Sequence, residues 1–189
     1  MKALKLRLNA LLFATVAAVL ITDLSAAEEP GDPDIALKPA HVIVTPWRFH
    51  IPPTKRQGVP GIERTAKGRL WAVYGRDVES SRNYQVLTFS DDDGKSWSDA
   101  QLMILPRRGV RASGGCVWID PQGRLWVFWM QAFGLQDGRY GIFAIMSDDP
   151  DADEPQWSAP RRLGDGIMLN KPTVLSDGDW PVSYTHLTL

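Results

Sequence analysis

Short runs of aromatic and β-branched residues recur along the chain, each bounded by Gly, Pro or Asp. Runs of this kind are typical of β-strands, and no segment after residue 27 has sustained helical periodicity. The pattern predicts strands at 61–65, 70–74, 84–89, 101–105, 115–119, 125–130, 140–146, 161–163 and 171–175. The expected fold class is therefore all-β, built from antiparallel hairpins.

The strand pattern also repeats at a fixed distance. The segment Gly68–Trp71 (GRLW) recurs 55 residues later as Gly123–Trp126, and a further step of 55 reaches Gly178, which Trp180 closely follows. A period of this length, with four short strands in each unit, is typical of β-propeller blades. We expect a partial propeller over residues 56–183, with blades at about 56–106 and 107–164 and a truncated third blade from 165.

A polar stretch, Ser90–Trp97 (SDDDGKSW), separates two of the predicted strands. Asp and Gly favour a tight turn there, and Trp97 can fold back over the turn as an aromatic lid. A longer copy that lacks the glycine runs from Ser147 to Trp157. The residues expected to have a structural role in the first turn are Ser90, Asp92, Gly94 and Trp97.

The pattern Ser-x-Asp-x-Gly-x-Ser-Trp resembles the Asp box, or BNR repeat, of the sialidase-like β-propellers. These propellers have six blades, so the resemblance implies an N-terminal fragment with two blades and the start of a third. Residues 184–189 depart from the blade pattern and resemble translated sequencing-adaptor sequence, so we expect them to be an artefactual tail.

The first 27 residues are predicted to be a signal peptide. A basic start precedes an apolar run over 10–21, and Ser25–Ala27 supplies small residues for cleavage. The apolar run is shorter than the roughly 20 residues that a bilayer crossing needs, so we do not expect an anchor. The mature protein is expected to be secreted or periplasmic, without membrane association after cleavage.

Residues 28–55 are rich in proline and charge and are predicted to be a leader segment. His41 and His50 lie in this segment and are expected on the surface or in loops. The single cysteine, Cys116, cannot form an internal disulfide, so packing alone has to stabilise the exported protein.

The composition narrows the class of partner. The chain has 44% hydrophobic and 23% charged residues, which is typical of a soluble globular protein, and its net charge of −1 gives no reason to expect nucleic acid. Eight tryptophans suit both strand packing and stacking on sugar rings. No metal or cofactor is expected, because the His, Cys and acidic residues lack the spacing of metal ligands.

Alternating strand direction places the predicted turns at two opposite ends of each unit. The Asp-box turns lie at one end, so we expect Asp91, Asp92 and Asp93 to hold a turn and not to be catalytic. The loop at 75–83 lies at the other end, where arginine and carboxylate residues are frequent. An end of this kind suits an anionic sugar.

This loop is the strongest candidate for chemistry. Glu79 or Asp77 is the expected general acid, a role that requires a carboxyl group protonated near the working pH. The residues expected to bind the substrate are Arg76, Arg82, Arg56, Arg111 and Lys171.

The resemblance implies a more detailed mechanism. In the sialidases three arginines hold the substrate carboxylate, an Asp in the first loop is the acid/base, and a Tyr paired with a Glu is the nucleophile. In this chain Gly58–Pro60 stands where the family has Arg-Ile-Pro, and neither Asp77 nor Glu79 aligns with the family acid without a shift of register. The nucleophile and the other arginines would lie beyond Leu189.

Several functions therefore stay open at this point. The first is an exported, exo-α-sialidase-like glycoside hydrolase that acts on terminal acidic sugars of glycans. The second is a non-catalytic carbohydrate-binding propeller, which the missing family arginine at Gly58 favours because a fold does not fix a function. The third is a polysaccharide lyase or another exo-glycosidase on the same scaffold. In each case the expected partner is a glycan or an acidic sugar.

Overall fold

The computed structural model describes residues 35–49, 57–76, 83–107, 109–133, 140–168 and 170–185. These residues form antiparallel β-sheets, and within them the only helical element is a short 3₁₀ turn, η1 (Ile35–Leu37). The predicted all-β fold class is confirmed, and the arrangement of the sheets is consistent with a fragment of a β-propeller.

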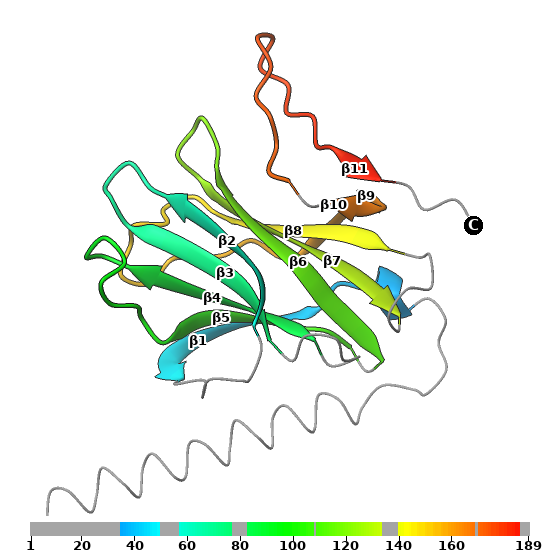
Figure 1. The fold of residues 1–189 in the computed structure, drawn as a ribbon, viewed down its shortest axis with the longest axis horizontal. Helices are drawn as coiled ribbons and strands as arrows, with labels where there is room; N and C mark the ends of the chain where they lie inside the picture. Colours follow the sequence, from blue (N-terminus) through cyan, green and yellow to red (C-terminus); the bar gives the residue numbers. More distant parts are fainter. Residues whose placement is uncertain are drawn as a thin grey trace, which may run out of the picture. The chain divides into compact units, whose positions relative to one another are not determined.

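The first sheet has five strands in the order β1-β5-β4-β3-β2, all antiparallel to their neighbours (Figure 1). Its strands are β1 (His41–Phe49), β2 (Gly58–Arg64), β3 (Leu70–Arg76), β4 (Tyr84–Ser90) and β5 (Ala100–Leu105). From β2 to β5 each strand pairs with the next one along the chain, which is the connection that short turns favour.

The second sheet repeats this meander with four strands in the order β6-β7-β8-β9. They are β6 (Val110–Ile119), β7 (Leu125–Phe133), β8 (Gly141–Ser147) and β9 (Arg161–Asp165). A small third pairing joins β10 (Ile167–Met168) to β11 (Tyr184–Thr185), with a long loop between them that is orange to red in Figure 1.

Every strand predicted within the two sheets is present, but two predictions differ from the structure. Part of the predicted leader segment is β1, which pairs with β5 from His41 to Phe49 and completes the first sheet. The alternation of valine and isoleucine in β1 was hidden by the neighbouring prolines. No strand forms at 171–175, although Thr173 and Leu175 donate their N–H groups to Pro181 and Asp179 across the following turn.

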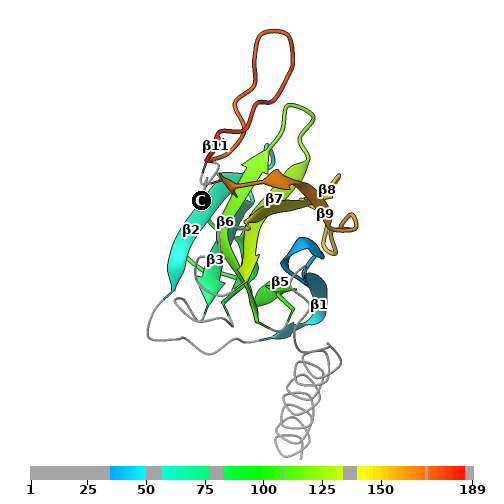
Figure 2. The ribbon, with the colours of Figure 1, turned by 90° about the vertical axis from the view of Figure 1, so that its right-hand side faces the viewer.

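The main core lies between the two sheets. β6 packs against β2, β3 and β4, so the two meanders lie side by side (Figure 2). Alternate residues of each sheet point into this layer, as strand geometry requires. The largest buried side chains in it are Trp71, Leu87, Leu102, Ile104, Leu125, Trp129, Phe143 and Ile145.

The second sheet is apolar on both faces. β7 is buried from its first residue, Leu125, to Ala132, and only Phe133 is exposed. Leu125, Val127 and Trp129 face the first sheet, whereas Trp126 and Phe128 belong to a second cluster that Trp180 and Val182 help to cover. A strand buried on both sides needs a neighbour on each face.

The 55-residue repeat appears as a repeated hydrogen-bond pattern. Three turns, Thr65–Arg69, Asp120–Arg124 and Leu175–Asp179, each have a backbone bond of 2.9–3.0 Å between their end residues. The fourth residue of each turn is a glycine with positive φ, which a left-handed turn position favours: Gly68, Gly123 and Gly178.

The N-terminal segment 35–40 is attached to the second sheet by one side chain. The buried Gln131 of β7 accepts hydrogen bonds from Ala40 N (2.8 Å) and from Trp129 Nε1 (2.9 Å). Its amide nitrogen donates to the carbonyls of Ala36 (3.2 Å) and Lys38 (2.8 Å). Since β1 continues from this segment into the first sheet, residues 35–49 form a strap that joins the two sheets.

We expect Gln131→Ala to lower the free energy of unfolding by about 2–4 kcal/mol, because it removes the partner of two buried N–H groups. Chemical denaturation monitored by circular dichroism measures this change. The control is Gln101→Ala: Gln101 is half-buried and donates one bond to Asp99 O, so its loss should cost about 0.5 kcal/mol or less. Equal losses for the two variants would show that Gln131 is not the attachment point.

β2 and β6 approach closely at a pair of glycines. A Cβ on Gly61 would lie 3.2 Å from the carbonyl oxygen of Gly115. A Cβ on Gly115 would lie 2.5 Å from Gln85 Oε1 and 2.8 Å from Val73 Cγ2. The two sheets can therefore pack at this distance only if position 115 has no side chain.

Gly115→Ala should accordingly destabilise the protein by about 1–3 kcal/mol through overpacking. The matched control is Gly164→Ala in β9, because a Cβ there meets no atom within 4 Å. That change should stay within about 0.5 kcal/mol. Thermal melts of both variants beside the parent measure the difference, and a stable Gly115→Ala protein would contradict the close approach of the sheets.

Candidate functional site

The strand registers define two ends of the molecule. Leu70 pairs with Ser90 and Leu125 with Ser147, so both Asp-box turns leave the sheets at one end, the Asp-box end. Arg76 pairs with Tyr84 at the opposite end, the loop end, where the segment 77–82 connects β3 to β4. The predicted separation of the two kinds of turn is therefore present in the strand pairing.

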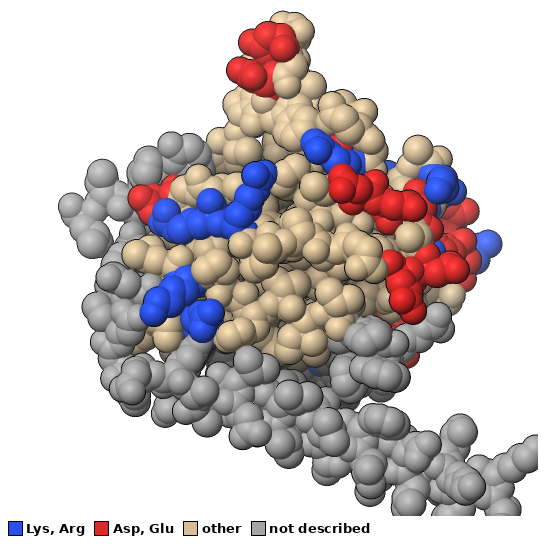
Figure 3. Space-filling model, turned by 180° about the vertical axis from the view of Figure 1, so that it is seen from behind, with Lys and Arg blue, Asp and Glu red and all other residues tan. Residues whose placement is uncertain are grey.

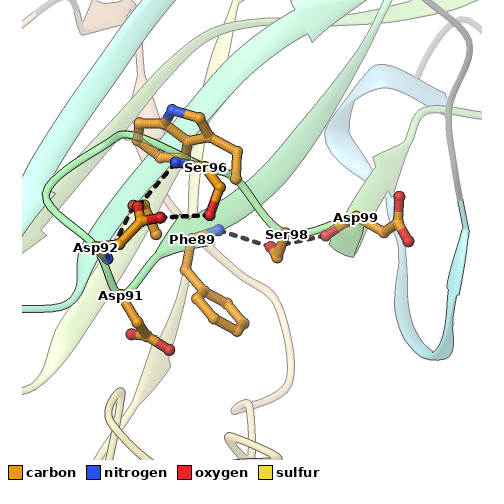
Figure 4. A pocket seen from close by; sticks show the side chains of 8 residues that line it. Phe89, Asp91, Asp92, Ser96, Ser98 and Asp99 are labelled. Carbon is orange, nitrogen blue, oxygen red and sulfur yellow. Dashed lines mark hydrogen bonds between the residues drawn. The ribbon is translucent and has the colours of Figure 1, made fainter.

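The first Asp box is held by its own side chains (Figure 4). Ser90 Oγ donates to Asp92 Oδ1 (2.8 Å) and accepts from Gly94 N (2.9 Å). Asp92 also accepts from Ser96 N (2.8 Å) and from Ser96 Oγ (2.5 Å). Asp93 and Gly94 supply the positive φ angles, 60° and 80°, that reverse the chain.

These bonds hold Asp92 in its ionised form. The hydrogen bonds from Ser96, followed by the one from Ser90, lower the pKa of Asp92 to about 2 from an ordinary value of 3.8. The neighbouring carboxylates are also engaged, because Arg69 contacts both oxygens of Asp91 (2.7 and 3.0 Å) and Arg64 pairs with Asp93. The three carboxylates therefore hold the turn, and the lowered pKa of Asp92 keeps that group ionised at neutral pH.

Both Asp-box turns end in the same clasp. Ser98 donates its N–H to Phe89 O (2.8 Å) and accepts from Phe89 N through its hydroxyl (3.0 Å). Ser158 makes the same two bonds with Met146, at 2.8 and 3.0 Å. The second turn therefore closes like the first although it is longer and lacks the glycine.

The second Asp-box turn also binds the first sheet. Trp71 Nε1 donates to Pro150 O (3.1 Å), and Arg69 Nη1 donates to Ala152 O (2.8 Å). Thr65 Oγ1 donates to Asp151 Oδ1 (2.6 Å). These bonds join the two repeats at the Asp-box end.

At the loop end, four of the predicted site residues lie outside the described part of the chain: Asp77, Glu79, Arg82 and Arg56. Arg76 is described as the last residue of β3, and it is only 2% exposed. Burial raises the pKa of Tyr74, and the nearby Arg76 charge opposes part of that rise. Arg76 therefore lies within the sheet at the base of the candidate loop.

A buried network of amide groups holds the chain where it re-enters the first sheet at Asn83. Gln85 Nε2 donates to Ala112 O of β6 (2.8 Å) and to Asn83 Oδ1 (3.3 Å). Ala112 N donates to Asn83 O (2.8 Å), so the residue at which the loop returns to the sheet is tied to the second sheet. Arg111, a predicted substrate-binding residue, is half-buried next to this contact.

Lys171 has a different environment from the one expected. Its ammonium group forms an ion pair with Glu63 of β2 (2.7 Å), and Glu63 lies next to Arg64 at the end of that strand. Burial raises the pKa of the neighbouring Cys116 thiol to about 11, although Lys171 opposes the rise. Cys116 is therefore protonated at neutral pH and is not a thiolate nucleophile.

In Figure 3, acidic side chains gather mainly at the right of the face seen from behind, while basic side chains lie at the left and also beside the acidic ones at the right. Within the described ranges, no three His, Cys, Asp or Glu side chains converge so that they could hold a metal ion. Nor does the described part of the chain form a helix with the length and apolar character that crossing a membrane requires.

Two buried polar residues at the loop end, Gln85 and Gln131, were not among the residues predicted from the sequence. Each lies in an otherwise apolar strand and is completely or almost completely buried. A polar residue at an inward-facing strand position is the signal that could have identified them, because such a group needs a hydrogen-bond partner.

No protein-family model matches this chain, and no match is found among curated proteins. Solved structures do match, and one of them is named "Hadza microbial sialidase Hz136". It is 18% identical, with a TM-score of 0.45, and the match covers 56% of this chain and 25% of that chain. The matched region thus spans about a quarter of that protein's length.

The bonds to Asp92 predict a pH dependence. The pKa of Asp92 is lower in the folded state, so its ionised form stabilises the fold above the ordinary pKa of 3.8, and that contribution is lost as the pH falls through about 2. Asp92→Asn should melt several degrees below the parent at pH 7, and the gap should narrow across that window.

Asp93→Asn is the matched control for this experiment. Asn tolerates the positive φ at that position, and an exposed ion pair with Arg64 contributes little. Melting curves of the three proteins from pH 7 to pH 2 measure the effect. A gap between Asp92→Asn and the parent that does not change with pH would contradict the proposed role of the Asp92 charge.

Proposed function

We propose that this chain belongs to an exported, sialidase-like glycoside hydrolase that acts on terminal acidic sugars of glycans. The Asp box and the triple repeat of the Gly68, Gly123 and Gly178 turns support a propeller of this type. The predicted signal peptide at 1–27 supports export to the periplasm or the medium.

The observation that supports the proposal is where the strands on either side of the first loop end. Arg76 and Tyr84, which flank the segment 77–82 in the chain, pair at the end of the first sheet opposite the Asp box. The bonds of Asn83 and Gln85 to Ala112 bring the base of this loop next to Arg111 of the second sheet. Arg111 is thus the chain neighbour of the residue that bonds Asn83, the first described residue after the segment that carries Asp77 and Glu79.

In the proposed mechanism, Glu79 or Asp77 donates the proton to the leaving oxygen of the glycoside. Arg82, Arg111 and Arg56 bind the anionic sugar, since a guanidinium forms paired hydrogen bonds with a carboxylate. Arg76 is buried, which suits a fixed positive charge at the base of the loop. Lys171 contributes only if its pairing with Glu63 opens.

A second candidate is a non-catalytic carbohydrate-binding propeller. One structural observation favours it: Gly58, which stands where the related enzymes have an arginine, pairs with Gly75 and offers no side chain to a substrate. A site with fewer fixed positive charges binds an acidic sugar more weakly in its reactive geometry. A polysaccharide lyase or another exo-glycosidase remains a variant of the first proposal with different bond chemistry.

The test of the acid uses leaving groups of different basicity. In the full-length protein, Glu79→Gln should reduce the rate on a natural acidic glycoside by roughly 10²–10⁴. The loss should be far smaller on an aryl glycoside with an acidic phenol, because that leaving group needs little protonation. Asp77→Asn is the matched variant, and one of the two should behave in this way.

Two outcomes would reject the assignment. If both variants hydrolyse natural acidic glycans at the parent rate, the first loop is not the site of proton donation. If the parent binds acidic glycans in a calorimeter without releasing sugar, the binding propeller replaces the hydrolase. Steady-state rates on both substrates and the binding isotherm together distinguish these cases.

A further inference from the structure

A hollow of about 520 Å³ lies beside the first Asp-box turn, at the end opposite the proposed reaction site. Residues 89–92 and 96–99 line it (Figure 4). It contains an aromatic ring, carboxylates and hydroxyl groups on a short, internally bonded turn. A rigid turn of this kind can present these groups in a fixed arrangement.

Phe89 and Trp97 are the aromatic residues that line the hollow, and the more exposed of them is Trp97, at 43%. Its exposure is not required by the motif, because the equivalent Trp157 of the second Asp box packs edge-on against Trp71 at 6.0 Å. The turn itself supports the Trp97 indole: a Cβ added to Gly94 would lie 3.7 Å from Trp97 Cζ2. One repeat therefore uses this tryptophan for packing, whereas the other holds it at the surface.

The polar groups around the indole include two carboxylates, Asp91 and Asp92, that accept hydrogen bonds. Arg69 pairs with Asp91, and Ser90 and Ser96 donate to Asp92. A carboxylate has about four acceptor positions, so both groups can accept further hydrogen bonds. The Arg69 partner of Asp91 reduces the attraction of that carboxylate for a free cation.

We propose that this hollow binds an uncharged sugar ring. The ring stacks its C–H face on the Trp97 indole, and its hydroxyl groups donate to the Asp91 and Asp92 carboxylates. An acidic sugar is repelled by the Asp92 carboxylate, because the Ser90 and Ser96 groups that bond it are neutral and leave its charge in place. The chain thus has a second carbohydrate site, selective for uncharged sugars, at the end opposite the proposed reaction site.

The test follows the indole N–H signals of the full chain by ¹⁵N NMR during titration with D-galactose, N-acetyl-D-glucosamine and D-mannose. The Trp97 signal is assigned by its loss in Trp97→Phe. At least one of the sugars should shift this signal to saturation, and N-acetylneuraminic acid should not. Trp97→Ala should weaken binding of that sugar about tenfold, measured by calorimetry, and Trp97→Phe should weaken it less.

Leu163→Ala is the matched control. Leu163 of β9 is 45% exposed, close to the value for Trp97, and it does not line the hollow. Its removal should leave the affinity unchanged. The melting temperature of each variant is recorded beside the affinity, so that a loss of fold is separated from a loss of the ring.

Three results would overturn the proposal. The first is the absence of a shift of the Trp97 signal with all three neutral sugars. The second is a parent-like affinity in Trp97→Ala. The third is a preference for a cation, shown by binding of choline or a lysine peptide that disappears in 0.5 M salt, about where charge interactions are screened. None of these readouts depends on hydrolysis, so they test the hollow separately from the reaction site.

Discussion

The structure depends on a single constraint: the second sheet is apolar on both faces. β7 buries eight consecutive residues, and alternate side chains enter two different clusters. Such a sheet is stable only between two neighbours, because leaving either face in water would expose large aromatic side chains. The first sheet covers one face, and residues around Met168, Trp180 and Val182 cover part of the other. Face-to-face packing of the two sheets follows from this pattern of burial.

Hydrogen bonds then fix how the first two sheets meet. At the Asp-box end, the buried Trp71 indole donates to Pro150 O of the next repeat. At the loop end, Gln85 and Asn83 bind Ala112, and Gln131 binds the strap. Buried polar groups that lose their partners cost more than they gain when paired, so these contacts select one arrangement of two apolar surfaces. Packing supplies the stability, and the amides and the indole supply the register between sheets.

The repeated strands and turns could be predicted from sequence because the information for them is local. Four residues, such as Gly68–Trp71, are enough to define a turn and the strand that follows. The parity of the loops followed from strand direction alone. The hydrogen-bond partners of Gln131 in the strap and the pairing of Lys171 with Glu63 could not be predicted, since these partners lie 91–108 residues apart in the chain. A glutamine at an inward-facing strand position indicates that a partner is needed, but not which group supplies it. Strand direction was also enough to predict at which end the first loop lies. The bonds of Asn83 and Gln85 to Ala112 of the second sheet could not be predicted, because they depend on how the sheets pack.

The strap has a consequence for the order of folding. Its first bond, between Ala40 and Gln131, spans 91 residues, whereas the clasp between Phe89 and Ser98 spans 9. Because closing a long loop costs more chain entropy, the local meander from β2 to β5 can form first. On the ribosome, the segment 35–40 has to wait until β7 has been synthesised before it finds its hydrogen-bond partners. The connection that joins the two sheets therefore forms late, although half of it is among the first described residues to be made.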